Sequence, residues 1–89
     1  MSKTPLDFLW FIPSAGDNAY LSHPETDRAP TPRYLRENGK VFEEVDVLRR
    51  TIHARTGVQI NECRLYRNRC EIGYPLPEGT QIVHKGDPV

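Results

Sequence analysis

The clearest structural signal in this chain of 89 residues is VFEEVDVLRRTIHARTG, residues 41–57. Acidic residues come early in this segment and basic residues come late, an order that complements the dipole of an α-helix. Apolar residues recur every three or four positions and therefore share one helix face, at Val41, Val45, Leu48 and Ile52. Gly57 can adopt the left-handed conformation that ends a helix. The pattern predicts a helix over about residues 41–56.

Two local details of this helix can also be predicted. Asn38 is a candidate N-cap residue, because its side-chain oxygen can accept a hydrogen bond from a free backbone N–H. Asp46 stands four positions before Arg50, so the two side chains can pair across one helical turn.

Three strand-like runs follow the helix, at 58–66, 70–74 and 80–84. The run 58–66 is rich in residues that favour β-structure, and the run 70–74 alternates apolar and polar residues. Short polar or proline-containing connections separate the three runs. We therefore expect a three-stranded antiparallel meander with one face covered by the helix, an α+β fold in a small single domain.

The first third of the chain has a different character, because five of its first 32 residues are proline. The apolar run Phe8–Ile12 predicts a short strand, and the proline-rich sequence after it predicts a long loop. We accordingly expect a strand-plus-loop arm at 1–37 and a small α+β module at 38–89.

Charge and cysteine content exclude several classes of protein. Lys and Arg together number 12, as do Asp and Glu, so the formal net charge is zero and nucleic acid is not an expected partner. The longest early apolar run, Phe8–Ile12, is far shorter than the roughly 20 residues of a membrane helix. It is also shorter than the apolar region that a signal peptide needs. Two cysteines are too few for a disulfide scaffold. We expect a cytoplasmic protein with a protein partner or a homo-oligomeric assembly.

Residues 7–37 also carry an extended motif, consisting of Trp10-Phe11-Ile12-Pro13, Gly16-Asp17, Tyr20-Leu21, Arg28 and Tyr34-Leu35. This motif resembles the N-terminal segment of the bacterial luciferase-like flavin-dependent monooxygenases, most closely those that act on alkanesulfonates. The resemblance implies that Phe8–Ile12 is the first strand of a TIM barrel. It places Pro13, Ser14 and Asp17 on the substrate face and implies FMN as the cofactor, with dioxygen as oxidant and with sulfite and an aldehyde as products.

Two departures limit what this resemblance implies for the isolated chain. Ala15 stands where close relatives often have histidine, and the likeness fades after Glu37. A TIM barrel needs about 250 residues, so this chain cannot close one. We expect a truncated or composite relative that has no catalytic residues or cofactor of its own. The alternative is a stand-alone α+β protein-binding module without flavin chemistry.

Other clusters of residues have two interpretations each. Three arginines, Arg64, Arg67 and Arg69, surround Tyr66 and form either a patch for phosphates or a solvated hairpin tip, which the neutral net charge favours. Six residues separate Cys63 from Cys70, wider than the usual zinc-binding pairs, so we expect buried cysteines instead of a metal site with His53 and His84. The sequence leaves the redox state of the two cysteines open. Trp10 and Phe11 are expected in the core, although they could also face a ligand.

Overall fold

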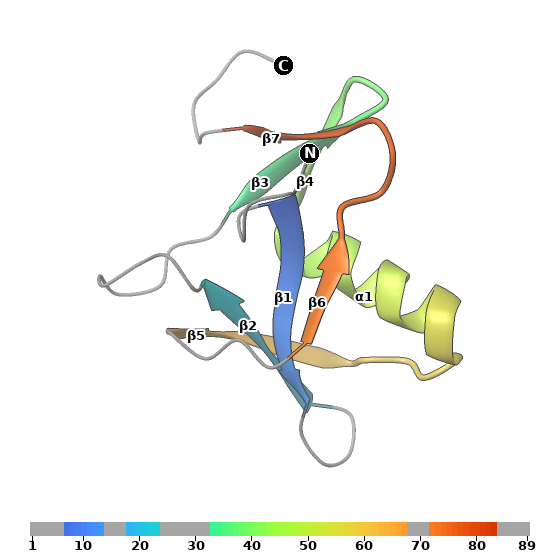
Figure 1. Ribbon diagram of the computed structural model, residues 1–89. Helices are drawn as coiled ribbons and strands as arrows, with labels where there is room; N and C mark the ends of the chain where they lie inside the picture. Colours follow the sequence, from blue (N-terminus) through green and yellow to red (C-terminus); the bar gives the residue numbers. More distant parts are fainter. Residues whose placement is uncertain (1–6, 14–17, 24–32, 68–71, 84–89) are drawn as a thin grey trace.

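The computed structural model describes residues 7–13, 18–23, 33–67 and 72–83. These ranges form one helix and seven strands in two sheets (Figure 1). In chain order the elements are β1 (Phe8–Pro13), β2 (Asn18–His23), β3 (Tyr34–Glu37), β4 (Lys40–Glu43), α1 (Glu44–Thr56), β5 (Glu62–Arg67), β6 (Ile72–Pro75) and β7 (Thr80–Val83). The predicted α+β class is confirmed.

The larger sheet has four strands in the order β5-β2-β1-β6. Strand β1 is antiparallel to both of its neighbours, whereas β2 and β5 run parallel. Phe11 lies opposite Leu21, and Leu21 lies opposite Leu65, so apolar residues from three strands line up on one face. Tyr74 of β6 stacks on Phe11 on the same face, with ring centroids 5.4 Å apart.

The smaller sheet has the order β4-β3-β7, with both edge strands antiparallel to β3. Its central residue is Leu35, which is fully buried and lies opposite Phe42 and Ile82. Asn38 and Gly39 connect β3 to β4, with φ values of 54° and 80°. Positive φ at both central residues is typical of the type I′ turn that joins two-residue hairpins, and Asn-Gly is its preferred sequence.

A single core joins the two sheets to α1, which lies behind β6 in Figure 1. Buried side chains come from β1, β2, β3 and α1, so strands from the first 37 residues share this core with the helix. They are Leu9, Phe11, Ala19, Leu21, Leu35, Val47, Leu48 and Ile52. The buried apolar residues of α1 recur at helical spacing and the buried residues of β1 recur at every second position, so each element places one face in the core.

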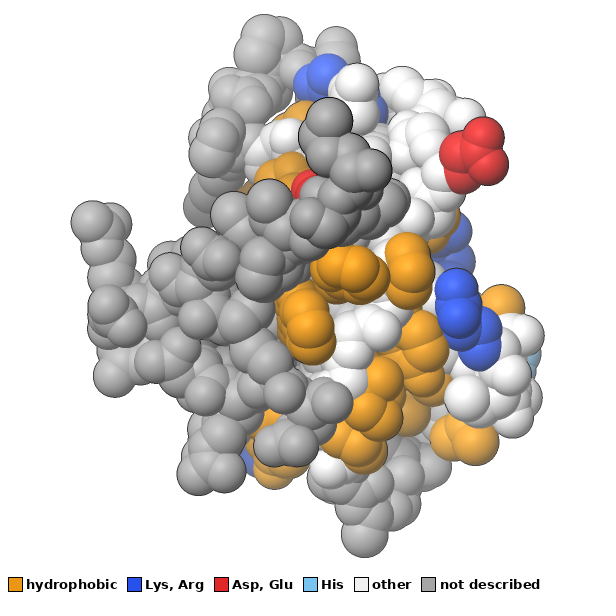
Figure 2. Space-filling view, viewed as in Figure 1, with side chains coloured by type: hydrophobic (Ala, Val, Ile, Leu, Met, Phe, Trp, Pro, Cys, Tyr) orange, Lys and Arg blue, Asp and Glu red, His pale blue; other side chains and the backbone are white. Residues whose placement is uncertain are grey.

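The opposite face of the larger sheet is also partly apolar. Along β1, the partly buried Phe8, Trp10 and Ile12 alternate with the buried Leu9 and Phe11. Figure 2 shows apolar side chains gathered on the face where β1 and β6 lie in Figure 1. The expectation that the aromatic pair belongs to the core is therefore met by Phe11, whereas Trp10 lies on the other side of the sheet.

The predicted meander requires a correction. Three strands do form near the predicted positions, but β5 pairs with β2, β6 with β1 and β7 with β3. In the described sheets, β5, β6 and β7 do not pair with one another. β1 and β2, from the first 37 residues, lie between β5 and β6 in the larger sheet, and β7 pairs with β3 in the smaller sheet. Residues 68–71, which include most of the predicted hairpin loop, lie outside the described ranges, and Arg67 belongs to β5.

The helix ends where predicted but begins later. Gly57 has φ 77°, and its N–H donates to the carbonyl of His53 over 2.9 Å. The expected start near residue 41 is wrong, because residues 40–43 pair with β3 as β4. Asn38 is not the N-cap. That position is held by Glu43, whose side chain makes no capping hydrogen bond, and the N–H of Glu44 donates instead to the carbonyl of Arg33 over 2.9 Å.

The predicted Asp46–Arg50 ion pair is also absent. Asp46 pairs with Arg49 at 3.6 Å, and Arg50 pairs with Glu37 of β3 at 3.1 Å. The Arg50 guanidinium in addition lies over the Phe42 ring, 5.0 Å from its centroid. The tertiary partners of Arg50 thus replace the expected contact within the helix.

The predicted arm at residues 1–37 contributes β1, β2 and β3, although only its first strand was expected. These strands belong to both sheets, so each sheet combines residues from either side of residue 37. The division into 1–37 and 38–89 stays a prediction. Across the described ranges, no helix is both long enough and apolar enough to cross a membrane.

Candidate functional site

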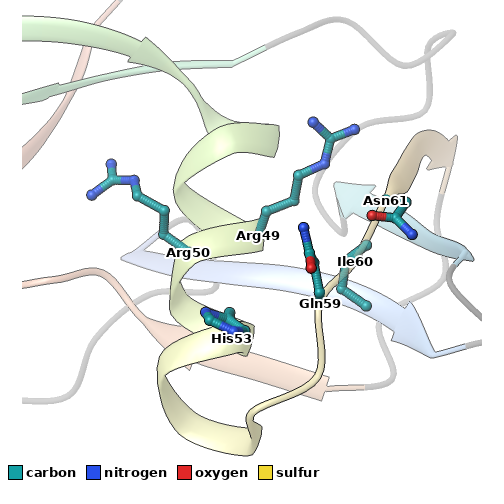
Figure 3. Close-up of a pocket in the computed structure, with 6 residues that line it drawn as sticks. All are labelled: Arg49, Arg50, His53, Gln59, Ile60 and Asn61. Carbon is teal, nitrogen blue, oxygen red and sulfur yellow. The ribbon is translucent and has the colours of Figure 1, made fainter.

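A polar pocket lies beside the second half of α1 and has a volume of about 450 Å³. Two segments line it, as Figure 3 shows. The helix contributes Arg49, Arg50 and His53, and the connection from α1 to β5 contributes Gln59, Ile60 and Asn61. Because the left-handed Gly57 ends the helix and turns the chain back, residues 59–61 run alongside the helix that they follow.

The two arginines extend in different directions from the helix (Figure 3). Arg50 points away from Gln59 and is held by Glu37 and the Phe42 ring. Arg49 points to the side on which Gln59 and Asn61 lie. Arg49 is therefore the cation that this side of the pocket offers.

The guanidinium of Arg49 is only lightly engaged. Its Nη1 lies 3.6 Å from the carboxylate of Asp46, which is itself about half exposed. Its Nε is buried and has no hydrogen-bond partner among the residues that the structure describes. A guanidinium has five N–H donors in a planar arrangement, so Arg49 keeps donors for an anionic oxygen.

Gln59 and Asn61 add the polar groups of neutral amides to this side of the pocket. Each amide offers two N–H donors and one carbonyl acceptor. A guanidinium next to two amides can bind a group that carries one negative charge and several acceptor oxygens. Ile60, which is half-buried, supplies an apolar surface at the base of the same pocket.

The candidate residues predicted from the sequence do not converge on this pocket. Pro13 is exposed at the end of β1, while Ser14 and Asp17 lie outside the described residues. Arg64 is exposed on β5 and pairs with Glu62 at 3.0 Å. Arg67 ends β5, and Arg69 lies outside the described ranges, so the basic patch stays a prediction.

The cysteine and histidine cluster is only partly described. Cys63 is a free thiol and is half-buried in β5, and His53 is exposed on α1. Cys70 and His84 lie outside the described ranges. Within the described part of the chain, no group of three or more His, Cys, Asp or Glu side chains could hold a metal ion.

The pocket was not predicted because Gln59 and Asn61 lie within the predicted strand 58–66, whereas β5 begins only at Glu62. The predicted helix stop at Gly57 was a signal that could have indicated the pocket. A glycine that ends a helix in the left-handed conformation turns the chain back, so the residues directly after Gly57 can run alongside the helix. Polar residues immediately after such a stop are therefore candidates for a site shared with the last helical turns.

Part of the sequence is similar to that of a known protein. Over 51 residues, which are 56% of this chain, the sequence is 43% identical to the vancomycin B-type resistance protein VanW of Enterococcus faecalis. The match covers 18% of that protein, so this chain spans less than a fifth of its length. No family model matches the chain, and no solved structure matches it significantly.

These findings correct the resemblance to luciferase-like flavin-dependent monooxygenases. The partial similarity to VanW does not point to an alkanesulfonate monooxygenase, whether truncated or composite. The topology gives the physical reason. The first strand of a TIM barrel lies between parallel neighbours, whereas β1 is antiparallel to both β2 and β6. The implied FMN cofactor and sulfonate substrate have no remaining basis.

Proposed function

We propose that this chain is a small ligand-binding domain that holds a carboxylate group in the pocket between α1 and residues 59–61. The observation that carries the proposal is the position of Arg49, which lies on the same side of the pocket as Gln59 and Asn61. A carboxylate has one negative charge and two oxygens in a plane. A planar guanidinium can bind both oxygens at once and balances the single charge, whereas one guanidinium does not balance the larger charge of a phosphate monoester.

Binding at this site should be weak. The formal net charge of the chain is zero, so no long-range field attracts an anion. Arg49 is 37% exposed, and exposed ion pairs typically contribute only about 0–1 kcal/mol. A dissociation constant on the order of 1 mM, equivalent to about −4 kcal/mol, is the expected scale for a small probe.

The direct test is a titration of the ¹⁵N-labelled chain with N-acetylglycine, a small carboxylate with one peptide group. We expect saturable shifts of the side-chain NH₂ signals of Gln59 and Asn61 and of the Nε–H signal of Arg49. The Arg49→Gln variant should lose these shifts. Arg64→Gln is the matched control, because Arg64 is exposed, pairs with a carboxylate and does not line the pocket.

Two outcomes would contradict the carboxylate site. One is a set of shifts that are equal in Arg49→Gln and in the unmodified chain. The other is a stronger response to inorganic phosphate than to N-acetylglycine, which would identify a different anion as the ligand.

The partial similarity to VanW supports a second proposal, that the chain contributes to vancomycin resistance. The relative is named for resistance, and the match reaches 43% identity over 51 residues. The test is the minimal inhibitory concentration of vancomycin for an Enterococcus faecalis host that lacks VanW, with and without this chain expressed. An increase that Arg49→Gln abolishes would support both proposals. An unchanged concentration with a well-expressed chain would exclude the resistance role for this chain acting alone.

We also propose a cytoplasmic location and a protein partner or a second copy as assembly partner. The free thiol of Cys63 is compatible with a reducing compartment. Cell fractionation tests the location, and sedimentation of the purified chain tests self-association.

A further inference from the structure

A second cavity, of about 160 Å³, lies at the start of α1. It is bounded by the first turn of α1 and by the parallel pair β2 and β5. Its walls are formed by Leu21, Arg33, Glu44, Val45, Cys63 and Leu65, together with the N-cap residue. None of these residues lines the polar pocket next to residues 59–61.

Most of this cavity is apolar and uncharged. Leu21 is buried, and Val45 and Leu65 are partly buried against the core. The thiol of Cys63 is neutral at physiological pH, because burial raises its pKa to about 11 in spite of the opposing effect of Arg49. A protonated thiol is a small apolar group with a weak donor, so it extends the apolar wall.

One end of the cavity carries an ion pair. Arg33 Nη2 lies 2.5 Å from Glu44 Oε2 and also donates to the carbonyl of Phe8 over 2.7 Å. The side chains are 12% and 1% exposed, respectively. A charged pair this far from water creates a strong local field, and a hydrogen-bonding group of a ligand would gain from facing it.

The size of the cavity limits its occupant. An engineered cavity of about 150 Å³ with apolar walls in another protein stays dry and binds benzene. The present cavity has a similar volume but adds a polar end. We propose that it is a second binding site, specific for a neutral compound with one six-membered aromatic ring and a single hydroxyl group. The ring would contact Leu21, Val45 and Leu65, and the hydroxyl would face the Arg33–Glu44 pair.

The experiment uses phenol as the probe and benzene as its apolar counterpart, with ¹³C-methyl spectra of the full chain as the readout. We expect phenol to shift the methyl signals of Leu21, Val45 and Leu65 in a saturable manner, at lower concentration than benzene. Signals of Ile60 in the polar pocket serve as the internal control and should not move. Absence of saturable shifts, or equal responses to phenol and benzene, would overturn the proposal.

Two further measurements keep the proposal testable if a variant fails to fold. Val45→Phe reduces the cavity and should weaken phenol binding, and an unchanged affinity in the folded variant would contradict the site. In a Cys70→Ser chain, Cys63 is the sole thiol, and saturating phenol should slow its alkylation by iodoacetamide several-fold. An alkylation rate that phenol leaves unchanged would also contradict the site. N-acetylglycine should not slow the reaction, which separates this cavity from the carboxylate pocket.

Discussion

At the scale of single residues, the contact between Trp10 and Gly73 shows how closely the outer face of the larger sheet is packed. The two residues lie opposite each other on β1 and β6. A Cβ atom added at Gly73 would stand 2.8 Å from Cζ3 of Trp10, a separation shorter than van der Waals contact. Gly73 therefore allows the indole ring to lie directly on the backbone of the neighbouring strand, where Phe8 flanks it with a centroid distance of 5.6 Å.

The Gly73→Ala substitution tests this contact. The added methyl group must displace the Trp10 ring, so we expect a loss of about 1–3 kcal/mol in the free energy of unfolding, the usual cost of overpacking. Urea denaturation followed by tryptophan fluorescence measures it. In a Trp10→Leu background the same substitution should cost much less, and an equal cost in both backgrounds would show that the ring is not the obstacle.

Glu44 gives a second test at the residue scale, through pH. Burial raises the pKa of the Glu44 carboxyl above its ordinary value, although the charge and hydrogen bond of Arg33 oppose the shift. A raised pKa means that the folded state binds this proton more tightly than the unfolded state does. The resulting stabilisation is complete below the unfolded pKa and is lost as pH rises through the folded pKa.

Wild type should therefore lose stability relative to Glu44→Gln as pH rises from below 4.5, the ordinary value, to neutrality. Urea midpoints of both proteins at matched pH values provide the measurement. Parallel curves, or a wild type that gains stability relative to the variant, would show that pairing with Arg33 outweighs burial.

At the scale of elements, the sequence predicted the position and end of the helix but not its start. The apolar repeat and the stop at Gly57 are local properties, and local properties are retained in the fold. The start depends on a tertiary competition, because residues 40–43 gain more by pairing with β3 than by extending the helix. The signal for this outcome was the Asn38-Gly39 dipeptide, which favours a hairpin turn more strongly than an N-cap.

The Gly39→Ala substitution tests the turn. Gly39 has φ 80°, and among the described residues no atom beyond its chain neighbours lies within 4 Å of an added Cβ, so strain in the backbone is the expected cost. That cost should be about 1–2 kcal/mol, the penalty for an L-residue in the left-handed region. Asn38→Gly, which also suits a positive φ, is the matched control and should change the urea midpoint little. Equal losses in both variants would argue against a type I′ turn.

At the scale of the whole molecule, pairing between distant strands is what the sequence could not predict. The runs predicted as strands at residues 58–66, 70–74 and 80–84 form strands at 62–67, 72–75 and 80–83, but the sequence of a run does not indicate which strand it pairs with. β2 was not predicted, because it lies in a proline-rich region that the sequence predicts as a loop. The polar pocket depends less on this pairing, because α1 and the residues that follow it supply its walls. Arg49 and Arg50 of this pocket lie on the predicted helix. Their different directions depend on the contacts of Arg50 with β3 and β4, which the sequence does not indicate.

Residues on both sides of position 37 build one core. Leu9, Phe11, Leu21 and Leu35 come from one side, and Val47, Leu48 and Ile52 come from the other. The most direct measurement compares ¹H–¹⁵N correlation spectra of the full chain and of a fragment comprising residues 38–89. Because the two parts share one core, we expect dispersed signals for the full chain in β1, β2, β5 and β6 alike, and collapsed signals for the fragment. A fragment whose signals remain dispersed at the positions seen in the full chain would contradict it, and residues 38–89 would then form a domain by themselves.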